Sequence, residues 1–248
     1  MKRFAALLLL LALASTAHAS GVSLRWGGCE GTANRNFACD KSTGQELLVG
    51  SFDPPSGIAH LSGMEVVLRI TTADGKAPSW WMMFSAGSCR RSSVTLAFDM
   101  SDQVDCDDPW SGQAGGGFGA WEADGTGINV RMVGAVPPSA MGPVSSGRTY
   151  AGFKLLINHQ KSTGAGSCGG CEAPVCIKIE AIKLTDPGRL IDANSHMWEN
   201  KTWVLTDGIN AMGGASQVAT WQGGNANCAA GLAKPSTWSE LKSRFKSK

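Results

Sequence analysis

The sequence predicts an all-β protein: an antiparallel β-sandwich of the immunoglobulin-like or jelly-roll kind, with one short C-terminal helix. Glycine is abundant, at 32 of 248 residues, against a usual share of about 7%. Several separate runs alternate apolar and polar residues with a period of two, as strands with one buried face do. Alanine–leucine patterning of the helical kind is scarce beyond the N-terminal segment. Together these observations favour short strands joined by glycine-containing turns.

Residues 1–19 have the organisation of a secretory signal peptide. A basic head at positions 2–3 precedes an unbroken apolar run at 4–14, and positions 17–19 read Ala-His-Ala, an A-x-A cleavage site. The apolar run is shorter than the roughly 20 residues that a membrane-spanning helix needs, and no later run is long and apolar enough to form one. We therefore expect residues 1–19 to be removed and the remaining chain to be secreted, to an extracellular or periplasmic location, without a membrane span.

The rest of the chain is predicted to form one disulfide-linked sandwich domain over residues 20–234 and a C-terminal amphipathic helix over 235–248. Without Lys2 and Arg3 the charges balance, because 22 − 2 basic residues face 20 acidic ones. No basic block stands out before the last dozen residues. A nucleic-acid partner is therefore not expected, since binding to a phosphate backbone needs clustered positive charge.

The N-terminal half contains the clearest alternation of apolar residues. In residues 63–72, GMEVVLRITT, the side chains on one face are all apolar, which predicts a strand with one buried face. Residues 80–84, WWMMF, are apolar at every position and predict a central strand, and residues 73–76 form the turn between the two. Further strands are predicted at 45–52 and 93–99, and residues 109–119 are glycine-rich and contain Trp110 and Phe118.

The C-terminal half adds further strands, which are predicted at 128–132, 149–158, 175–184, 203–206 and 218–221. In residues 175–184 the apolar positions change from a spacing of two to a spacing of three, which predicts a β-bulge near Glu180-Ala181. The predicted core collects one apolar face from each of several runs: Met64, Val66, Leu68, Ile70, Val94, Leu96, Phe98, Phe153, Leu155, Ile157, Ile177 and Ile179.

The C-terminal tail changes character. Thr237 and Glu240 have the spacing of a capping box, which predicts a helix over residues 237–246. Trp238, Leu241 and Phe245 follow at positions i, i+3 and i+7, so that they share one face of this helix.

Eight cysteines, an even number, favour four disulfides in an exported protein. Proximity across a loop or a strand predicts the pairs Cys29–Cys39 and Cys89–Cys106. The other four cysteines, which allow three arrangements, are assigned by elimination to Cys168–Cys176 and Cys171–Cys228, with Gly169 and Gly170 allowing a tight bend. Four thiolates at Cys168, Cys171, Cys176 and Cys228 are also able to hold a tetrahedral zinc, but an oxidising compartment favours disulfides.

Several motifs resemble those of a group of exported bacterial proteins of unassigned function. They are GSCR at 87–90, CxDPWxGQAxGG at 106–117, CxGCxxPVC at 168–176 and the ending TWSELKSRFK, in which Ser239 replaces a usual glycine. This resemblance implies export and a shared cysteine framework, and it brings no activity. The runs GMEVVLRI and SVTLAFD also resemble cohesin-type sandwich modules, from which no binding residue is transferred.

The sequence offers few residues for catalysis or metal binding. Outside the signal peptide there are three histidines, His60, His159 and His196, each isolated, and neither G-x-S-x-G nor H-E-x-x-H occurs. The acidic loop 99–108 supplies four carboxylates that suit calcium, although their spacing is not that of an EF-hand and a solvated acidic turn is the alternative: Asp102, Asp105, Asp107 and Asp108.

The nine tryptophans admit two interpretations. Exposed indoles stack on sugar rings, whereas buried ones fill a core. The sequence favours a non-catalytic extracellular structural or binding module that uses no cofactor, with a carbohydrate or another extracellular protein as its partner. The alternatives are a carbohydrate-binding module, which a row of exposed tryptophans would favour, and a secreted hydrolase of unrecognised type. A deep pocket with a histidine and a carboxylate in contact would favour the hydrolase.

Overall fold

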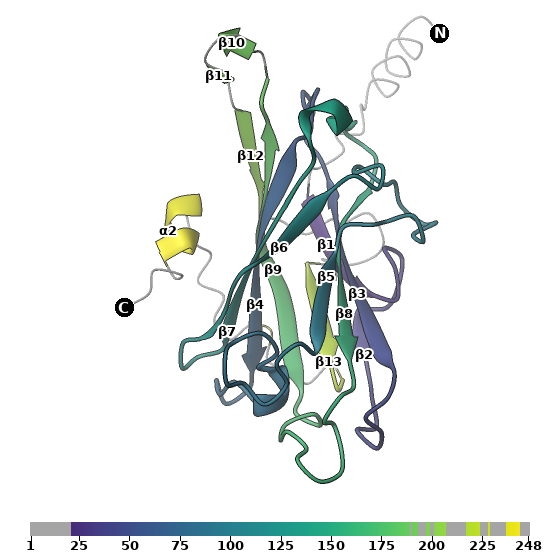
Figure 1. Cartoon of the computed structure of the whole chain (residues 1–248), viewed down its shortest axis with the longest axis vertical. Coiled ribbons are helices and arrows are strands. Elements are labelled where there is room, and N and C mark those ends of the chain that lie inside the picture. The colour runs from purple at the N-terminus through teal and green to yellow at the C-terminus, as the bar shows by residue number, and fades with distance from the viewer. Residues whose placement is uncertain are drawn as a thin grey trace, which may run out of the picture.

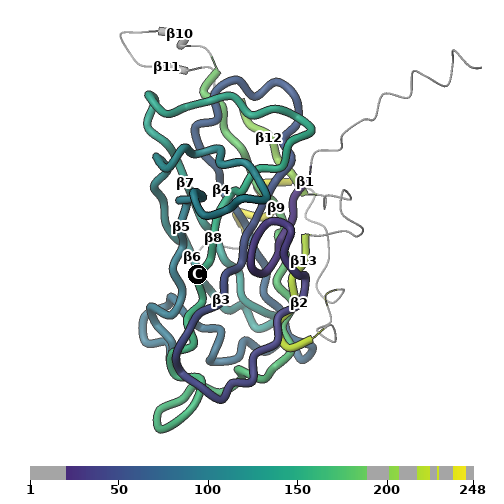
Figure 2. The backbone as a smooth tube through the Cα atoms, turned by 90° about the vertical axis from the view of Figure 1, so that its right-hand side faces the viewer, coloured from purple at the N-terminus to yellow at the C-terminus, as the bar shows by residue number. Residues whose placement is uncertain are grey.

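The protein is built from two β-sheets packed face to face, with one short helix near the C-terminus, as the computed structural model shows (Figures 1 and 2). The predicted all-β sandwich is thereby confirmed. The predicted signal peptide, Phe245 and His196 lie outside the described residues. Within those residues, no helix has the length and apolarity needed to cross a membrane. The structure describes residues 21–188, 190–192, 197–198, 201–206, 217–223, 228 and 237–243.

The smaller sheet contains four strands in the order β1-β3-β8-β5, and every neighbouring pair is antiparallel. Strands β3, β5 and β8 lie where the sequence predicts strands, whereas β1 is not among the predicted ones. The bounds are β1 (Gly21–Trp26), β3 (Gln45–Asp53), β5 (Val94–Ala97) and β8 (Tyr150–Asn158).

The larger sheet contains seven strands in the order β2-β13-β9-β4-β7-β6, with β12 pairing to β9 as well. All neighbours are antiparallel except β2 and β13, which are parallel. Its strands are β2 (Asn34–Arg35), β4 (Gly63–Thr72), β6 (Gly115–Ala123), β7 (Ile128–Ala135), β9 (Val175–Asp186), β12 (Lys201–Leu205) and β13 (Val218–Trp221). The remaining elements are β10 (Leu190–Asp192), β11 (Met197–Trp198), the 3-10 helices η1 (Ser79–Trp81) and η2 (Pro138–Ala140), and α2 (Trp238–Ser243).

The hydrophobic core lies between the two sheets and contains the residues that the alternation predicts. Eleven of the twelve predicted core residues are buried, and the twelfth, Leu96, is partly buried against the same cluster. The predicted bulge is also present. Opposite β4, the register of β9 passes from Ala181 to Ile179, which leaves Glu180 as the extra residue. This bulge changes the phase of β9, so that its apolar residues on both sides of it reach the core.

Strand β4 lies at the centre of the larger sheet and has two buried faces, where the sequence predicts one. Helix α2 accounts for the second face: Leu241, which is 1% exposed, packs on Val67 and Ala181. The predicted capping box forms, because Thr237 N–H donates to Glu240 Oε2 (3.0 Å) and Glu240 N–H donates to Thr237 Oγ1 (3.2 Å). A sequence pattern cannot show which sheet face a distant helix covers.

A buried carboxylate, that of Glu65, lies on the same face of the larger sheet that α2 covers. Glu65 on β4 is 7% exposed. Its carboxylate lies 2.6 Å from Arg131 on β7, 3.2 Å from Lys183 on β9 and 4.0 Å from Lys242 on α2. One carboxylate therefore contacts three cations from three elements, which satisfies the requirement that a buried charge be paired.

The prediction of a strand at 80–84 is wrong. Residues 79–81 form η1, and Trp80 and Trp81 are both fully buried with their rings 5.3 Å apart. Successive side chains of a strand point to opposite faces, whereas successive residues of a 3-10 helix are separated by a third of a turn. The tighter turn therefore brings both indoles into the core, and Phe84 is left 44% exposed.

The glycine-rich segment 109–119, to which the sequence assigns no strand, contains the start of β6 at Gly115. Gly116 on β6 is directly opposite Gly134 on β7, and the Phe98 ring covers both. A Cβ at either glycine would overlap this ring. These glycines therefore mark a close approach of an aromatic side chain to the sheet and not a turn.

Candidate functional site

All eight cysteines form disulfides, which indicates an oxidising extracellular or periplasmic compartment. No thiolate is left for the alternative zinc site. The predicted pairing is wrong in every case: Cys29–Cys39, Cys89–Cys106, Cys168–Cys176 and Cys171–Cys228 do not form. The pairs that form are Cys29–Cys106, Cys39–Cys171, Cys89–Cys168 and Cys176–Cys228.

Cys39 pairs far along the chain because its loop lies against the cysteine loop, residues 164–174. Phe37 stacks on His159 with ring centroids 3.8 Å apart. The amide of Gln222 donates to the carbonyls of both Phe37 (2.5 Å) and Cys171 (3.1 Å). These contacts place Cys39 beside Cys171, which is 132 residues away, and not beside Cys29.

Cys89 and Cys106 lie beyond opposite ends of β5, so the strand itself keeps them apart. Lys161 Nζ donates to the Cys89 carbonyl (2.7 Å), and Cys168 N–H donates to the Lys161 carbonyl (2.9 Å), which places Cys89 next to Cys168. At the other end, Asp107 N–H donates to the Thr149 carbonyl (3.0 Å). Strand spacing thus overrides proximity in sequence as the factor that decides these pairs.

Six of the nine tryptophans are at most 3% exposed, so the structure does not present a row of exposed indoles within its described residues. The largest aromatic cluster lies beneath the cysteine loop, where Trp80 stacks on Trp221 at 5.0 Å and Trp81 meets Trp221 edge-on at 5.7 Å. The indole N–H of Trp221 donates to the Cys171 carbonyl (2.7 Å), and that of Trp80 donates to Ser162 Oγ (2.9 Å). The cluster is therefore a support for the loop above it. The six buried tryptophans are Trp26, Trp80, Trp81, Trp110, Trp121 and Trp221.

Arg90, a buried cation, joins η1 to the segment that follows β8. It is 1% exposed, and its guanidinium lies 3.5 Å above the Trp80 ring. It donates to the carbonyls of Trp80 (2.8 Å), Gln160 (2.9 Å) and Asn158. Burial lowers the pKa of Arg90 to about 9, which still leaves the guanidinium protonated at neutral pH. A buried cation thus holds two loops together through their carbonyl oxygens.

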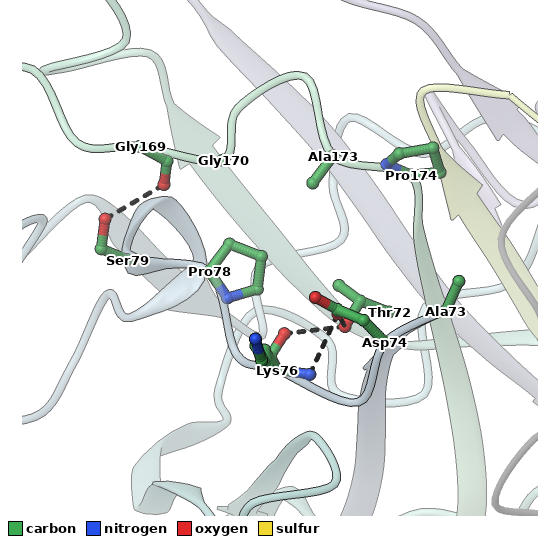
Figure 3. Close-up of a pocket in the computed structure, with 10 residues that line it drawn as sticks. All are labelled: Thr72, Ala73, Asp74, Lys76, Pro78, Ser79, Gly169, Gly170, Ala173 and Pro174. Atoms are coloured by element: carbon green, nitrogen blue, oxygen red, sulfur yellow. Dashed lines mark hydrogen bonds between the residues drawn. The ribbon is translucent and has the colours of Figure 1, made fainter.

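The candidate site is a groove of about 540 Å³ between the turn that follows β4 and the cysteine loop (Figure 3). We call it the proline groove. Pro78 and Pro174, with Ala73 and Ala173, give it an apolar surface, and Thr72, Asp74, Lys76 and Ser79 supply polar atoms at its rim. The lining residues are Thr72, Ala73, Asp74, Lys76, Pro78, Ser79, Gly169, Gly170, Ala173 and Pro174.

The rim turn is held by its own polar groups. Thr72 Oγ1 lies 2.8 Å from Asp74 Oδ1 and 2.7 Å from the Lys76 carbonyl oxygen, and Lys76 N–H donates to Asp74 Oδ1 (3.1 Å). The Thr72 hydroxyl, followed by the Lys76 N–H, lowers the pKa of the Asp74 carboxyl below its usual value. Asp74 is therefore a carboxylate at neutral pH, with a lysine on the same rim.

The two walls of the groove are joined directly. Ser79 Oγ and Trp80 N–H both donate to the Gly169 carbonyl at 3.0 Å. Gly170 has a φ of +95°, and a Cβ there would overlap Pro78, so this position requires glycine. Disulfides at Cys168 and Cys171 flank the two glycines. The groove is therefore preformed and rigid.

The sequence predicts only part of this groove. It identifies the bend at Gly169-Gly170 and the turn at 73–76, but not that the two meet. Pro78 and Pro174 are the residues from which the groove could have been suspected, because each lies on one wall and has a fixed φ. Nothing in a single sequence relates the two walls, because the contacting residues are 90 positions apart.

The four aspartates considered for calcium have separate partners. Within the described chain, no three of them bring carboxylate oxygens within 4.8 Å of one another; the one such trio of potential ligand atoms contains Asp105 with the disulfide-bonded Cys29 and Cys106. The partners are Lys154 for Asp102 (2.6 Å), the Glu30 N–H for Asp105 (2.7 Å), Arg148 for Asp107 (2.6 Å) and the Trp110 N–H for Asp108 (2.8 Å). The acidic loop is thus held by cations and backbone N–H groups of the protein.

A histidine and a carboxylate do meet, but both are buried. His159 Nε2 lies 3.1 Å from Glu46 Oε1, and Glu46 in turn lies 2.5 Å from Arg35. His159 and Glu46 are 3% and 7% exposed, and neither lines the proline groove. The Ser162 hydroxyl donates to the backbone carbonyl of His159 (2.7 Å) and not to its ring. The contact therefore cross-links the strands and does not form the accessible pocket that a hydrolase requires.

No protein-family model matches the sequence, and no curated protein matches it. The resemblance of its motifs to exported bacterial proteins therefore stays a prediction. Among solved structures, the chain is similar to a DUF4466 family protein from Parabacteroides merdae, with a TM-score of 0.23 and 11% sequence identity. The match covers 75% of this chain and 44% of that one. A similarity at this TM-score supports no inference about fold or function.

Proposed function

We propose that the protein is a binding module of an oxidising compartment, which holds an aliphatic side chain of another protein in the proline groove. The observation that carries this proposal is the preformed apolar groove, whose walls are joined by hydrogen bonds to Gly169 and whose cysteine-loop wall is anchored by two flanking disulfides. A rigid site loses little conformational entropy on binding, so that more of the contact energy appears as affinity.

The size and chemistry of the groove support an aliphatic group. Its volume of about 540 Å³ falls within the range of roughly 300–1,000 Å³ that is usual for binding sites. Ring carbons and methyl groups surround the opening, as Figure 3 shows for Pro78, Ala173 and Pro174. Asp74 and Lys76 place one charge of each sign at the rim, where they complement the polar backbone that flanks a side chain in a peptide.

The polar groups of the groove support binding and not catalysis. Its lining contains neither histidine nor cysteine. The Ser79 hydroxyl donates to the Gly169 carbonyl, and the Thr72 hydroxyl contacts Asp74 and the Lys76 carbonyl. Both hydroxyls are therefore engaged in holding the walls. The Thr72 hydroxyl does lie beside the Asp74 carboxylate, but the lowered pKa of Asp74 makes that carboxylate a weak base for activating it.

The test fills the groove by replacing Ala173 with tryptophan. We expect blocked tripeptides with a central leucine to shift the amide resonances of Ala73, Gly170 and Ala173 in the disulfide-intact protein. Tripeptides with a central glycine should not do so. In Ala173→Trp the affinity should fall at least about tenfold, or ~1.4 kcal/mol, because the indole occupies the space of the leucine.

The matched control is Ala165→Trp, which places the same side chain on an exposed position of the same loop, outside the groove. Its titration should equal that of the unmodified protein. Equal shifts with the leucine and glycine tripeptides, or an Ala173→Trp variant that binds as well as the control, would contradict the proposal.

A further inference from the structure

The free edges of the two sheets meet along one side of the sandwich. Strand β5 ends the order of the smaller sheet and β6 ends that of the larger one, so each is paired with a single neighbour. The two strands lie side by side without pairing (Figure 1). A groove of about 610 Å³, which we call the edge groove, lies between them and the segment 84–92. We propose that the edge groove is a second binding site and takes a neutral saccharide.

An exposed aromatic ring, that of Phe84, lines the edge groove. Phe84 is the one aromatic side chain among the exposed large apolar residues of the described chain. Its ring centroid lies 5.1 Å from that of Phe118, which in turn lies 5.5 Å edge-on from Trp121. Trp121 is 1% exposed and donates its indole N–H to the Trp81 carbonyl (2.9 Å). The exposed ring is thus the outer member of a series of aromatic contacts that leads to the buried Trp121, and a ring held in this way suits stacking on a sugar.

The rest of the edge groove is polar. Arg91 and Ser92 line it from the loop, Thr95 from β5 and Glu122 from β6. Within the part of the chain that the structure describes, neither the Arg91 guanidinium nor the Glu122 carboxylate has an ion-pair partner. Each is therefore able to bond to a ligand without breaking an internal pair.

These polar groups select for a neutral ligand with hydroxyl groups. A guanidinium donates, a carboxylate accepts, and the hydroxyls of Ser92 and Thr95 do both. Sugar hydroxyls likewise donate and accept, so they match both kinds of group. Because Arg91 and Glu122 carry opposite charges, the lining has no net charge, and an ionised ligand gains no advantage. An aromatic ring beside a few convergent polar groups is the composition expected of such a site.

A peptide that adds a strand is the main competitor, and two features of β6 disfavour it. Ser85 Oγ donates to the Trp121 carbonyl (2.6 Å), which occupies an acceptor on the free edge. The register of β6 shifts between Phe118 and Ala120, so its ladder is interrupted at Gly119. An added strand needs consecutive free backbone groups on one edge, and β6 does not offer them along this groove.

The test is an NMR titration of the disulfide-intact protein with cellobiose, maltose and N,N′-diacetylchitobiose at millimolar concentration. We expect at least one of these disaccharides to shift the amide resonances of Phe84, Thr95, Gly119 and Glu122. Phe84→Ala should weaken that binding at least about tenfold, whereas Phe84→Tyr, which keeps the ring, should retain it. Val104→Ala removes an apolar side chain that is 98% exposed elsewhere and should change nothing.

The experiments test the saccharide proposal and the proline-groove proposal independently, because the two grooves share no lining residue. Ala173→Trp should leave disaccharide binding unchanged, because residue 173 does not line the edge groove. The saccharide proposal is overturned if none of the three disaccharides shifts these resonances, or if Phe84→Ala binds as well as the unmodified protein. It is equally overturned if the shifts require an acidic disaccharide, or an extended valine-rich peptide, in place of a neutral sugar.

Discussion

Replacing Cys39 and Cys171 together by alanine is expected to lower the free energy of unfolding by about 2–5 kcal/mol. This disulfide closes the longest segment of the four, since its ends are 132 positions apart, and so restricts the unfolded chain most. Both cysteines are buried, at 6% and 1% exposure, and alanine leaves no buried polar atom at either position. Denaturant unfolding at equilibrium, without reductant, measures the change.

The matched control is the double alanine variant of Cys29 and Cys106, whose ends are 77 residues apart. Loop closure alone distinguishes the two variants by only about 0.5 kcal/mol. Binding of the leucine tripeptide to the proline groove should differ much more between the two variants, because of these four cysteines only Cys171 adjoins a wall of the groove. Loss of leucine-tripeptide binding in the Cys39/Cys171 variant and its retention in the control are expected. Equal binding by both variants would show that this disulfide does not shape the groove.

Trp221→Ala is expected to destabilise the protein by about 3–5 kcal/mol, as large-to-small substitutions of buried aromatic residues do. Trp221 is fully buried, and four aromatic rings lie within 6 Å of its ring centroid: those of Trp26, Phe37, Trp80 and Trp81. The substitution also removes the hydrogen bond to the Cys171 carbonyl. Thermal or denaturant unfolding gives the measurement.

Two further variants separate packing from hydrogen bonding at this position. Trp221→Phe keeps a ring but removes the indole donor to the Cys171 carbonyl. A loss of about 0.5–1.5 kcal/mol is expected for this hydrogen bond, because Gln222 still donates to the same carbonyl. Trp203→Ala removes an indole that is only partly buried, on β12, and should cost clearly less than Trp221→Ala. A Trp221→Ala effect as small as that of Trp203→Ala would contradict the role of this cluster as support for the cysteine loop.

The correct predictions rest on the alternation of apolar residues and on local capping signals. Period two identifies β4 and β9, and the change of spacing in β9 identifies the bulge at Glu180. The capping box at Thr237 predicts where α2 begins. Each of these signals depends on residues within a few positions of one another, so one sequence contains all the information required.

The incorrect predictions concern places where contacts between distant segments decide the structure. Residues 115–119 show no strand pattern in the sequence, and the role of Gly116 is explained only by the Phe98 ring that covers it. Trp80 and Trp81 look like a strand until the buried cluster is seen to draw both indoles inward. Cysteine pairing and the proline groove likewise require the placement of loops relative to one another. Local pattern therefore predicts strands and caps, and tertiary contacts decide the site.

Peptide mapping of the non-reduced protein by mass spectrometry tests the central claim most directly, namely that long-range disulfides fix the cysteine-loop wall of the proline groove. Residues 162–178 form one tryptic peptide with Cys168, Cys171 and Cys176, so the linked peptides must be fragmented both between Gly169 and Gly170 and between Cys171 and Cys176. The structure predicts that Cys168 is linked to Cys89 and Cys171 to Cys39. A Cys168–Cys176 bond, with Cys171 joined to Cys228, would leave this wall untethered and contradict the account.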